Sequence, residues 1–291
     1  MTNGKRIAAI GEVLWDMMPT GKQPGGAPAN FCFHANKLGA NTALISAVGK
    51  DKNGSEISQF LHDKGITLFL NTVEKQTGYV SINLEKGIPA YTIHEDIAWD
   101  FIAPSADALD WVSKADAICF GSLAQRSPVS KKSIELALDT AQPHALKVFD
   151  INLRQHYFTE GVLMKSLQMA NVVKLNDEEL DIISKILGLH GDTENMCRQL
   201  METFQLQLVA LTMGAQGSLL IRPDMVSFLN VPQIEAIDTI GAGDSFNAAL
   251  VVGLLHNKDL RLIHREATAY AAKVCTYSGG MPDFELEFLL P

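Results

Sequence analysis

Residues 238–246 read Asp-Thr-Ile-Gly-Ala-Gly-Asp-Ser-Phe, and an apolar pattern at helical spacing follows at Phe246, Ala249, Leu250, Gly253 and Leu254. The spacing predicts a helix that begins at the Gly-Ala-Gly turn. Such a turn directs the N–H groups of Gly241, Ala242 and Gly243 toward one point, where the helix dipole also favours negative charge. The stretch therefore predicts an anion-binding site at the start of a helix.

Asp244 is the carboxylate next to this predicted anion site. It could take the proton of a hydroxyl group as a phosphoryl group arrives, chemistry in which catalysis is mostly positioning and charge stabilisation. The helix N-terminus should lower its pKa below the usual Asp value of about 4, so that the proton moves late. The alternative is that Asp244 only caps a helix and the glycines only turn the chain. No P-loop and no G-x-G-x-x-G fingerprint competes for the phosphate role.

Upstream of this stretch, short apolar runs alternate with helical patterns. Several runs are apolar at consecutive positions, which favours strands buried on both faces of a parallel sheet. The predicted strands are Arg6–Ile10, Thr42–Val48, Ala117–Gly121, Lys147–Ile151, Val172–Leu175 and Leu208–Thr212, and the predicted helices include Pro28–Leu38, Glu56–Lys64 and Ser130–Ala141. The alternation indicates an α/β fold with ligands at the carboxyl ends of the strands.

One region breaks the alternation. Residues 65–100 read as successive strands without a helix, at Thr67–Asn71, Gly78–Leu84 and Ala90–His94, and Val13–Met17 has the same character. We expect one domain over residues 1–291, with a small antiparallel β lid formed by about residues 12–18 and 65–100. A sheet of that size leaves edges and an apolar face to cover, which favours a homodimer formed through the lid.

Composition narrows the possible partners. The chain has 291 residues, and 24 Lys and Arg against 33 Asp and Glu give a net charge of −9. Without a basic block, nucleic acid and anionic membranes are poor candidates for the main partner. The four cysteines have no metal-ligand spacing, so we expect free buried thiols of a reducing compartment and no zinc. The apolar run Ile7–Ile10 is too short for a signal peptide, so we expect a cytoplasmic protein.

With these motifs in place, the chain resembles the ribokinase-like, or PfkB-type, carbohydrate kinases, and among them the fructokinase-like members. Residues 238–246 are similar to the family's C-terminal signature, and Gly25-Gly26-Ala27-Pro28-Ala29-Asn30 with Ala35 and Leu38-Gly39 is similar to its N-terminal one. Weaker matches are Gly11-Glu12 with Asp16, Val48-Gly49 with Asp51 and Gly54, Asp150-x-Asn152-x-Arg154, Asn176-x-x-Glu179 and Thr212-x-Gly214-x-x-Gly217. The resemblance implies a three-layer α/β/α fold that holds a sugar under the lid and ATP along the C-terminal half.

The resemblance also implies roles for single residues. On the sugar side these are Asp16, Gly25, Gly26 and Asn30, although Gly25 and Gly26 read equally well as a plain turn. On the nucleotide side they are Asn176, Thr212, Gly214 and Gly217, with Glu179 holding Mg²⁺ through water. Arg154 is a candidate to neutralise phosphate charge, and a monovalent cation such as K⁺ could sit near Asp238.

The sequence thus predicts an ATP-dependent sugar kinase with Asp244 as the base, most simply a fructokinase. Other acceptors stay open, namely ribose, 2-keto-3-deoxygluconate or a nucleoside. A keto-acid acceptor should need an Arg or Lys under the lid. A non-catalytic sugar- or nucleotide-binding protein on the same fold is a further alternative, because a fold does not settle function.

Overall fold

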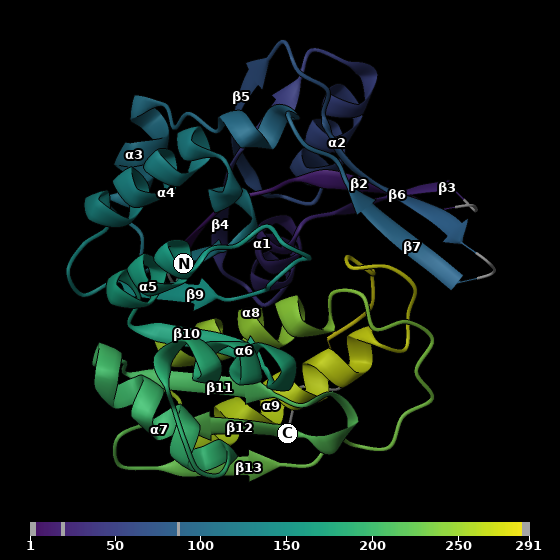
Figure 1. The fold of residues 1–291 in the computed structure, drawn as a ribbon. Coiled ribbons are helices and arrows are strands. Elements are labelled where there is room, and N and C mark those ends of the chain that lie inside the picture. The colour runs from purple at the N-terminus through teal and green to yellow at the C-terminus, as the bar shows by residue number, and fades with distance from the viewer. Residues whose placement is uncertain (1–3, 19–20, 86–87, 287–291) are drawn as a thin grey trace.

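A nine-stranded sheet organises the chain, as Figure 1 shows for the computed structural model, which describes residues 4–18, 21–85 and 88–286. Its strand order is β13-β12-β11-β10-β9-β8-β1-β4-β5, and every pairing from β5 to β11 is parallel. The strands, in chain order, are β1 (Arg6–Ile10), β4 (Asn41–Gly49), β5 (Thr67–Val73), β8 (Ala117–Gly121), β9 (Leu146–Asp150), β10 (Val172–Asn176), β11 (Leu208–Thr212), β12 (Ser218–Ile221) and β13 (Val226–Leu229). The last two form an antiparallel hairpin at one edge.

Helices cover both faces of this sheet. One face packs against α1 (Ala27–Lys37), α2 (Lys52–Asp63), α8 (Ala242–Leu255) and α9 (Leu260–Val274). The other packs against α3 (Ala106–Val112), α4 (Pro128–Thr140), α5 (Glu160–Met169), α6 (Asp177–Leu187) and α7 (Thr193–Phe204), and three short 3₁₀ turns lie at Ala98–Phe101, Leu123–Arg126 and Gly214–Gln216. Two apolar cores, one on each face, confirm the three-layer α/β fold.

A second, four-stranded sheet projects from the body and forms the lid (Figure 1). It consists of β3 (Gly21–Gly25), β2 (Leu14–Met18), β6 (Gly78–Glu85) and β7 (Ile88–Ile93), in that order. The pairs β2–β3 and β6–β7 are antiparallel, whereas β2 and β6 run parallel.

The lid differs from its predicted strands in two places. The segment from Thr67 pairs with β4 at the edge of the large sheet, because its register continues that parallel ladder from Ala43 to Gly49. Gly21–Gly25, which contains a Pro and no alternating apolar pattern, forms an edge strand of the lid instead. Residues 86 and 87 of the predicted lid lie outside the described residues.

The remaining expectations concern solvent and redox environment. The four cysteines are free; three are buried and Cys275 is half-buried, where full burial was predicted. Within the described residues, no helix combines the length and the apolarity needed to cross a lipid bilayer.

Candidate active site

The carboxyl ends of the parallel strands bring the predicted site together. The sheet register places Gly121 opposite Asp150, Asp150 opposite Lys174, and Asn176 opposite Thr212. Ligand sites of open parallel sheets lie at this edge. Residues that lie far apart in the sequence, from Gly121 to Thr212, therefore share one end of the sheet.

Asn30 and Asp244 connect the two signature motifs. The side-chain amide of Asn30, in α1, donates a 2.7 Å hydrogen bond to Oδ2 of Asp244, in α8. Oδ1 of Asn30 is buried and has no hydrogen-bond partner among the described residues. A buried carbonyl oxygen of this kind is costly unless a ligand satisfies it. The pair thus presents a carboxylate together with a vacant acceptor.

The pKa of Asp244 contradicts the sequence-based expectation of a lowered value. Burial raises it to about 6, and the Asp150 charge adds to the increase. The Asn30 hydrogen bond and the cations of Lys174 and Arg154 act in the opposite direction. Desolvation outweighs the helix N-terminus because neighbouring groups surround the partly buried carboxyl. Asp244 is therefore a better proton acceptor than an exposed Asp.

The turn before α8 offers free amides, as predicted, but in a different set. Gly241 caps the helix with φ of 77°, a conformation that glycine adopts readily. The N–H of Ala242, which was predicted to bind the anion, donates to the Thr239 carbonyl at 3.2 Å in this structure. The N–H groups of Gly241, Gly243 and Asp244 have no acceptor among the described residues. These three amides are therefore available to an anion at the start of α8.

The sugar-side residues lie at the base of the lid. Asp16, in β2, packs against Gly25, in β3, where a Cβ would collide with its carboxylate. Burial raises the pKa of Asp16 to about 6, Arg154 lowers it, and Asp238 raises it. Gly26, with φ of 103°, caps α1, and a Cβ there would lie 2.5 Å from the carbonyl oxygen of Glu12. Both glycines are thus needed for close approach.

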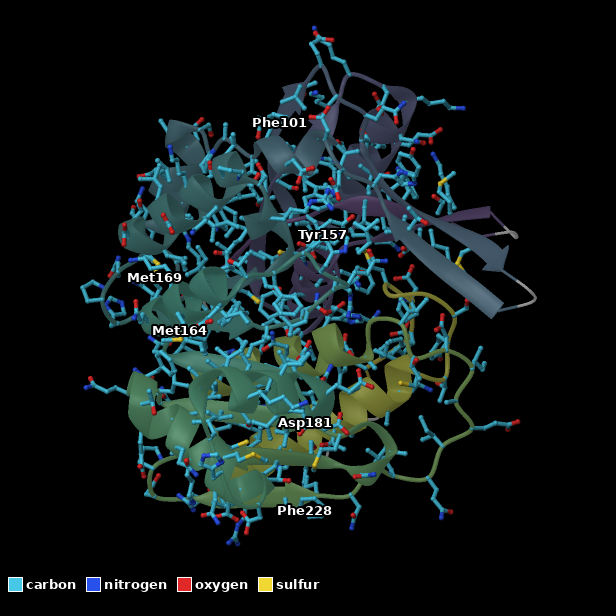
Figure 2. All side chains as sticks on the ribbon, in the orientation of Figure 1. Phe101, Tyr157, Met164, Met169, Asp181 and Phe228 are labelled. Carbon is cyan, nitrogen blue, oxygen red and sulfur yellow. The ribbon has the colours of Figure 1, made fainter. Side chains whose placement is uncertain are left out.

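Arg154 lies on a loop tied to the lid. Its positive charge acts on the carboxylates of Glu12, Asp16 and Asp244, and its side chain is exposed. The same loop carries Tyr157, labelled in Figure 2, whose hydroxyl donates to the Ile93 carbonyl of β7 at 3.0 Å. Asn152, with φ of 41°, lies in the left-handed region, which is uncommon for a residue other than glycine. The structure therefore places Arg154 near the sugar-side carboxylates.

Asn176 and Glu179 form a capping box at the start of α6. Asn176 Oδ1 accepts from the Glu179 N–H, and Glu179 Oε2 accepts from the Asn176 N–H, both at 2.8 Å. Glu179 Oε1 accepts from the Leu153 N–H at 2.8 Å. Each carboxylate oxygen keeps a second lone pair, which suits an outer contact to magnesium-bound water. No cluster of three or more metal-ligating side chains occurs in residues 4–18, 21–85 and 88–286.

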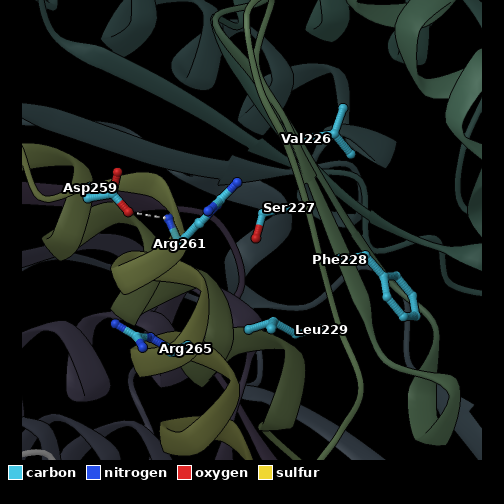
Figure 3. Close-up of a pocket in the computed structure, with 7 residues that line it drawn as sticks. All are labelled: Val226, Ser227, Phe228, Leu229, Asp259, Arg261 and Arg265. Atoms are coloured by element: carbon cyan, nitrogen blue, oxygen red, sulfur yellow. Dashed lines mark hydrogen bonds between the residues drawn. The ribbon is translucent and has the colours of Figure 1, made fainter.

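Thr212, Gly214 and Gly217 lie where β11 leaves the sheet. The Thr212 hydroxyl donates to the Leu175 carbonyl at 3.4 Å, and a Cβ on Gly217 would collide with the Leu229 carbonyl. Beyond Leu229, a pocket of about 470 Å³ opens between β13 and α9 (Figure 3). Its lining is Val226, Ser227, Phe228, Leu229, Asp259, Arg261 and Arg265, none of which was predicted.

Asp238 connects the turn before α8 to the segment after α9 through hydrogen bonds. Its Oδ1 accepts from the Ile240 N–H at 3.0 Å, and its Oδ2 accepts from the Gly279 N–H at 2.9 Å. Both carboxylate oxygens are therefore engaged by backbone. The residue orders the turn that leads into Gly241.

The sequence analysis did not identify three features that lie next to the candidate site. Lys174 is buried inside β10 and pairs with Asp150 at 3.0 Å, and its Nζ lies 3.0 Å from where a Cβ on Gly243 would be. A Lys in an otherwise apolar strand was the available signal. Glu12, noted only within a motif, is buried, and burial raises its pKa to about 7. The pair Gly279-Gly280 packs on Gly241 but carries no side chain that could have marked it.

A half-buried carboxylate beside free amides at a helix start, under a lid at the carboxyl ends of parallel strands, fits a kinase that phosphorylates a hydroxyl group. The chain belongs to the pfkB family of carbohydrate kinases, whose family model matches residues 8–286.

Known proteins agree with this membership. An uncharacterized sugar kinase, PH1459, of Pyrococcus horikoshii is 30% identical over 276 residues, covering 88% of this chain and 85% of the relative, and its crystal structure superimposes with a TM-score of 0.83. A fructokinase of Escherichia coli is 27% identical over 297 residues and covers 95% of both chains. The ATP complex of PH1459 covers 94% of both chains with a TM-score of 0.81. The enzyme is therefore a sugar kinase of ribokinase-like fold.

Proposed function

We propose that the enzyme transfers the γ-phosphate of ATP to D-fructose. Relatives named fructokinase, from Salmonella typhimurium and Escherichia coli, support this acceptor at 27% identity. A double mutant of the fructokinase of Vibrio cholerae, solved with fructose, ADP and potassium ion, is 24% identical and has a TM-score of 0.79.

The observation that carries the mechanism is the hydrogen bond from Asn30 to Asp244 beside three free amides. Asp244 takes the proton of the sugar hydroxyl, whose oxygen forms a bond to the γ-phosphorus. The bond from that phosphorus to the bridging oxygen breaks, and ADP leaves. A pKa of about 6 keeps Asp244 mostly ionised at neutral pH yet able to hold the proton.

The amides of Gly241, Gly243 and Asp244 stabilise charge on the transferred group. Lys174 adds positive charge beneath Gly243. Magnesium, when bound with ATP, neutralises phosphate charge, and Glu179 would hold its water shell. Thr212, Gly214 and Gly217 border the nucleotide in this proposal.

Charge on the sugar side favours a neutral acceptor. Asp16, Glu12 and Asp244 share the field of one guanidinium, that of Arg154. Asp16, Asn30 and the Gly25-Gly26 backbone then pair with sugar hydroxyl groups.

Arg154 also supports a second candidate, a sugar acid, because its cation could bind a carboxylate. Two relatives named 5-dehydro-2-deoxygluconokinase, each 24% identical, match that chemistry.

Two further properties belong to the proposal. A monovalent cation such as K⁺ would be coordinated by backbone carbonyl oxygens near Asp238. Both carboxylate oxygens of Asp238 already accept hydrogen bonds from backbone N–H groups. The lid would pair with the lid of a second copy, because β3 and β7 are edge strands.

The test is ATP turnover coupled to ADP detection with D-fructose, D-ribose, adenosine and 2-keto-3-deoxygluconate. We expect the highest kcat/KM for fructose. A site that hydrogen-bonds a hydroxyl rejects an analogue without it strongly, whereas shape alone discriminates by about 1–3 kcal/mol. Faster turnover of the keto acid would replace fructose by a sugar acid, and turnover of none would favour a binding protein.

A further inference from the structure

His34 is a buried residue of α1 with both ring nitrogens engaged. Its side chain is fully buried. Nε2 lies 2.9 Å from the Gly280 carbonyl oxygen, and Nδ1 lies 3.0 Å from the Tyr270 hydroxyl of α9. The ring therefore joins two helices to the segment that follows α9.

The partners decide where the proton sits. A carbonyl oxygen can only accept, so Nε2 carries the hydrogen and donates it to Gly280. Nδ1 of the neutral ring is then an acceptor, and the Tyr270 hydroxyl donates to it. Burial lowers the pKa of His34 to about 4, so the ring is neutral at working pH. The network therefore has one direction, from Tyr270 through His34 to Gly280.

Gly280 lies against Gly241, in the turn that begins α8. A Cβ on Gly241 would be 2.8 Å from Gly280 Cα, and a Cβ on Gly280 would be 2.8 Å from Asn30 Oδ1. The neighbouring Gly279 N–H donates to Asp238. Gly279-Gly280 is thus wedged between α1 and the turn that begins α8, touching both Asn30 and Gly241.

We propose that His34 is a positioning residue for phosphoryl transfer: by holding the Gly280 carbonyl, it fixes the Gly279-Gly280 segment that supports Gly241 and Asn30. The inference rests on the proposed role of the Gly241 turn and Asp244. Loss of the hydrogen bond from Nε2 lets the segment shift, and the amides and Asp244 lose their alignment. A misplacement of about 1 Å can cost about 100-fold in rate.

A purely structural role for a buried histidine looks different in this same chain. His264, in α9, is also fully buried, and its ring nitrogens contact the hydroxyls of Ser218 and Ser227 at 2.8 Å. Those partners are side chains of the β12–β13 hairpin. His34 instead binds main chain in a segment that touches two site residues.

The test compares His34→Leu, His34→Gln and Tyr270→Phe with wild type. Gln keeps a donor near the Nε2 position, whereas Leu removes it, and Phe removes only the hydroxyl. Asn171→Leu is the matched control, because Asn171 makes two side-chain hydrogen bonds, to Ala145 and Lys147, at the amino ends of the strands.

We expect His34→Leu to lower kcat by about 30- to 100-fold with both KM values within about threefold, and His34→Gln to restore kcat to within about threefold. Tyr270→Phe should lie between them. Asn171→Leu should lower the melting temperature and leave kcat unchanged. A kcat of His34→Leu within about threefold of wild type, failure of Gln to restore it, or an equal loss in Asn171→Leu would overturn the proposal.

Hydrogen–deuterium exchange separates this inference from the proposed function. The amides of residues 238–245 should exchange about tenfold faster in His34→Leu than in His34→Gln or Asn171→Leu. If wild type turns over no sugar, the proposed function fails while this measurement still tests His34. If His34→Leu does not fold, Tyr270→Phe against wild type carries the comparison, and unchanged exchange and kcat there would refute the role.

Discussion

The Asn30 amide and the Asp244 carboxylate meet across 214 residues of sequence through one 2.7 Å hydrogen bond. The bond joins the start of α1 to the start of α8, whose helices pack side by side on the same face of the sheet. Asn30 Oδ1 is buried and has no hydrogen-bond partner among the described residues. In the proposed reaction, Asn30 would both orient the base and offer an acceptor to the sugar.

Replacement of Asp244 by Asn should lower kcat by about 10³-fold or more, while ATP and sugar affinities change little. The Asn side-chain amide cannot take the hydroxyl proton. The Asp244 carboxylate that it replaces acts only in the transition state of the proposed reaction. Steady-state kinetics with calorimetric binding will measure both effects. Asp139→Asn, on the exposed surface of α4, is the control and should match wild type. Turnover of a folded Asp244→Asn enzyme within about tenfold of wild type would refute the assignment.

Activity should fall on the acid side with a midpoint near pH 6. Asp244 must be ionised to accept a proton, and its pKa is raised to about 6 by burial and Asp150. The pH profile of kcat/KM reports this group in the free enzyme. Asn30→Ala removes a hydrogen bond that lowers this pKa, so the acid limb should move to higher pH. Asn195→Ala, exposed on α7, should leave the limb in place; a limb that stays fixed or moves down in Asn30→Ala contradicts the coupling.

Glu12→Gln should stabilise the ligand-free enzyme at alkaline pH. Burial raises the pKa of Glu12 to about 7, so the folded state binds this proton more tightly than the unfolded state. The stabilisation is complete below the unfolded pKa and is lost as the pH rises through about 7. Gln stays neutral, so its free energy of unfolding should exceed that of wild type by about 2–3 kcal/mol at pH 8.

Urea unfolding of Glu12→Gln and wild type from pH 5 to pH 8 will show this difference. Glu202→Gln, exposed on α7, should reproduce the wild-type curve. A difference between Glu12→Gln and wild type that does not grow with pH would show that Glu12 is ionised in the folded protein.

Light scattering at micromolar concentration should give twice the 31.7 kDa chain mass, because lid edges tend to be covered by a partner. Met17, on lid strand β2, is 38% exposed, and Met17→Lys should shift the mass toward one chain. Val129→Lys, at an exposed position of α4, should remain dimeric. A monomer mass for wild type would rule out the lid dimer.

Much of the fold, and the local geometry around several candidate site residues, could be predicted from local sequence. Strand β1, strand β8 and strand β11 have the predicted bounds, because runs of buried apolar residues carry their own signal. The Gly241 turn and the Asn176 cap were also readable, since each depends on residues within a few positions. The lid was harder, because an edge strand such as Gly21–Gly25 lacks an apolar pattern and depends on the strand beside it.

By itself, the sequence determined the α/β class, the helix that begins after Gly241, and the residues Asp244 and Asn30 as site candidates. Only the tertiary structure decided which amides are free, that the pKa of Asp244 rises, and that Lys174 and Gly280 lie beside the turn that begins α8. The physical reason is range. Backbone turns and caps depend on neighbours in sequence, whereas desolvation and charge depend on every group that folding packs around a side chain, whatever its position in the chain.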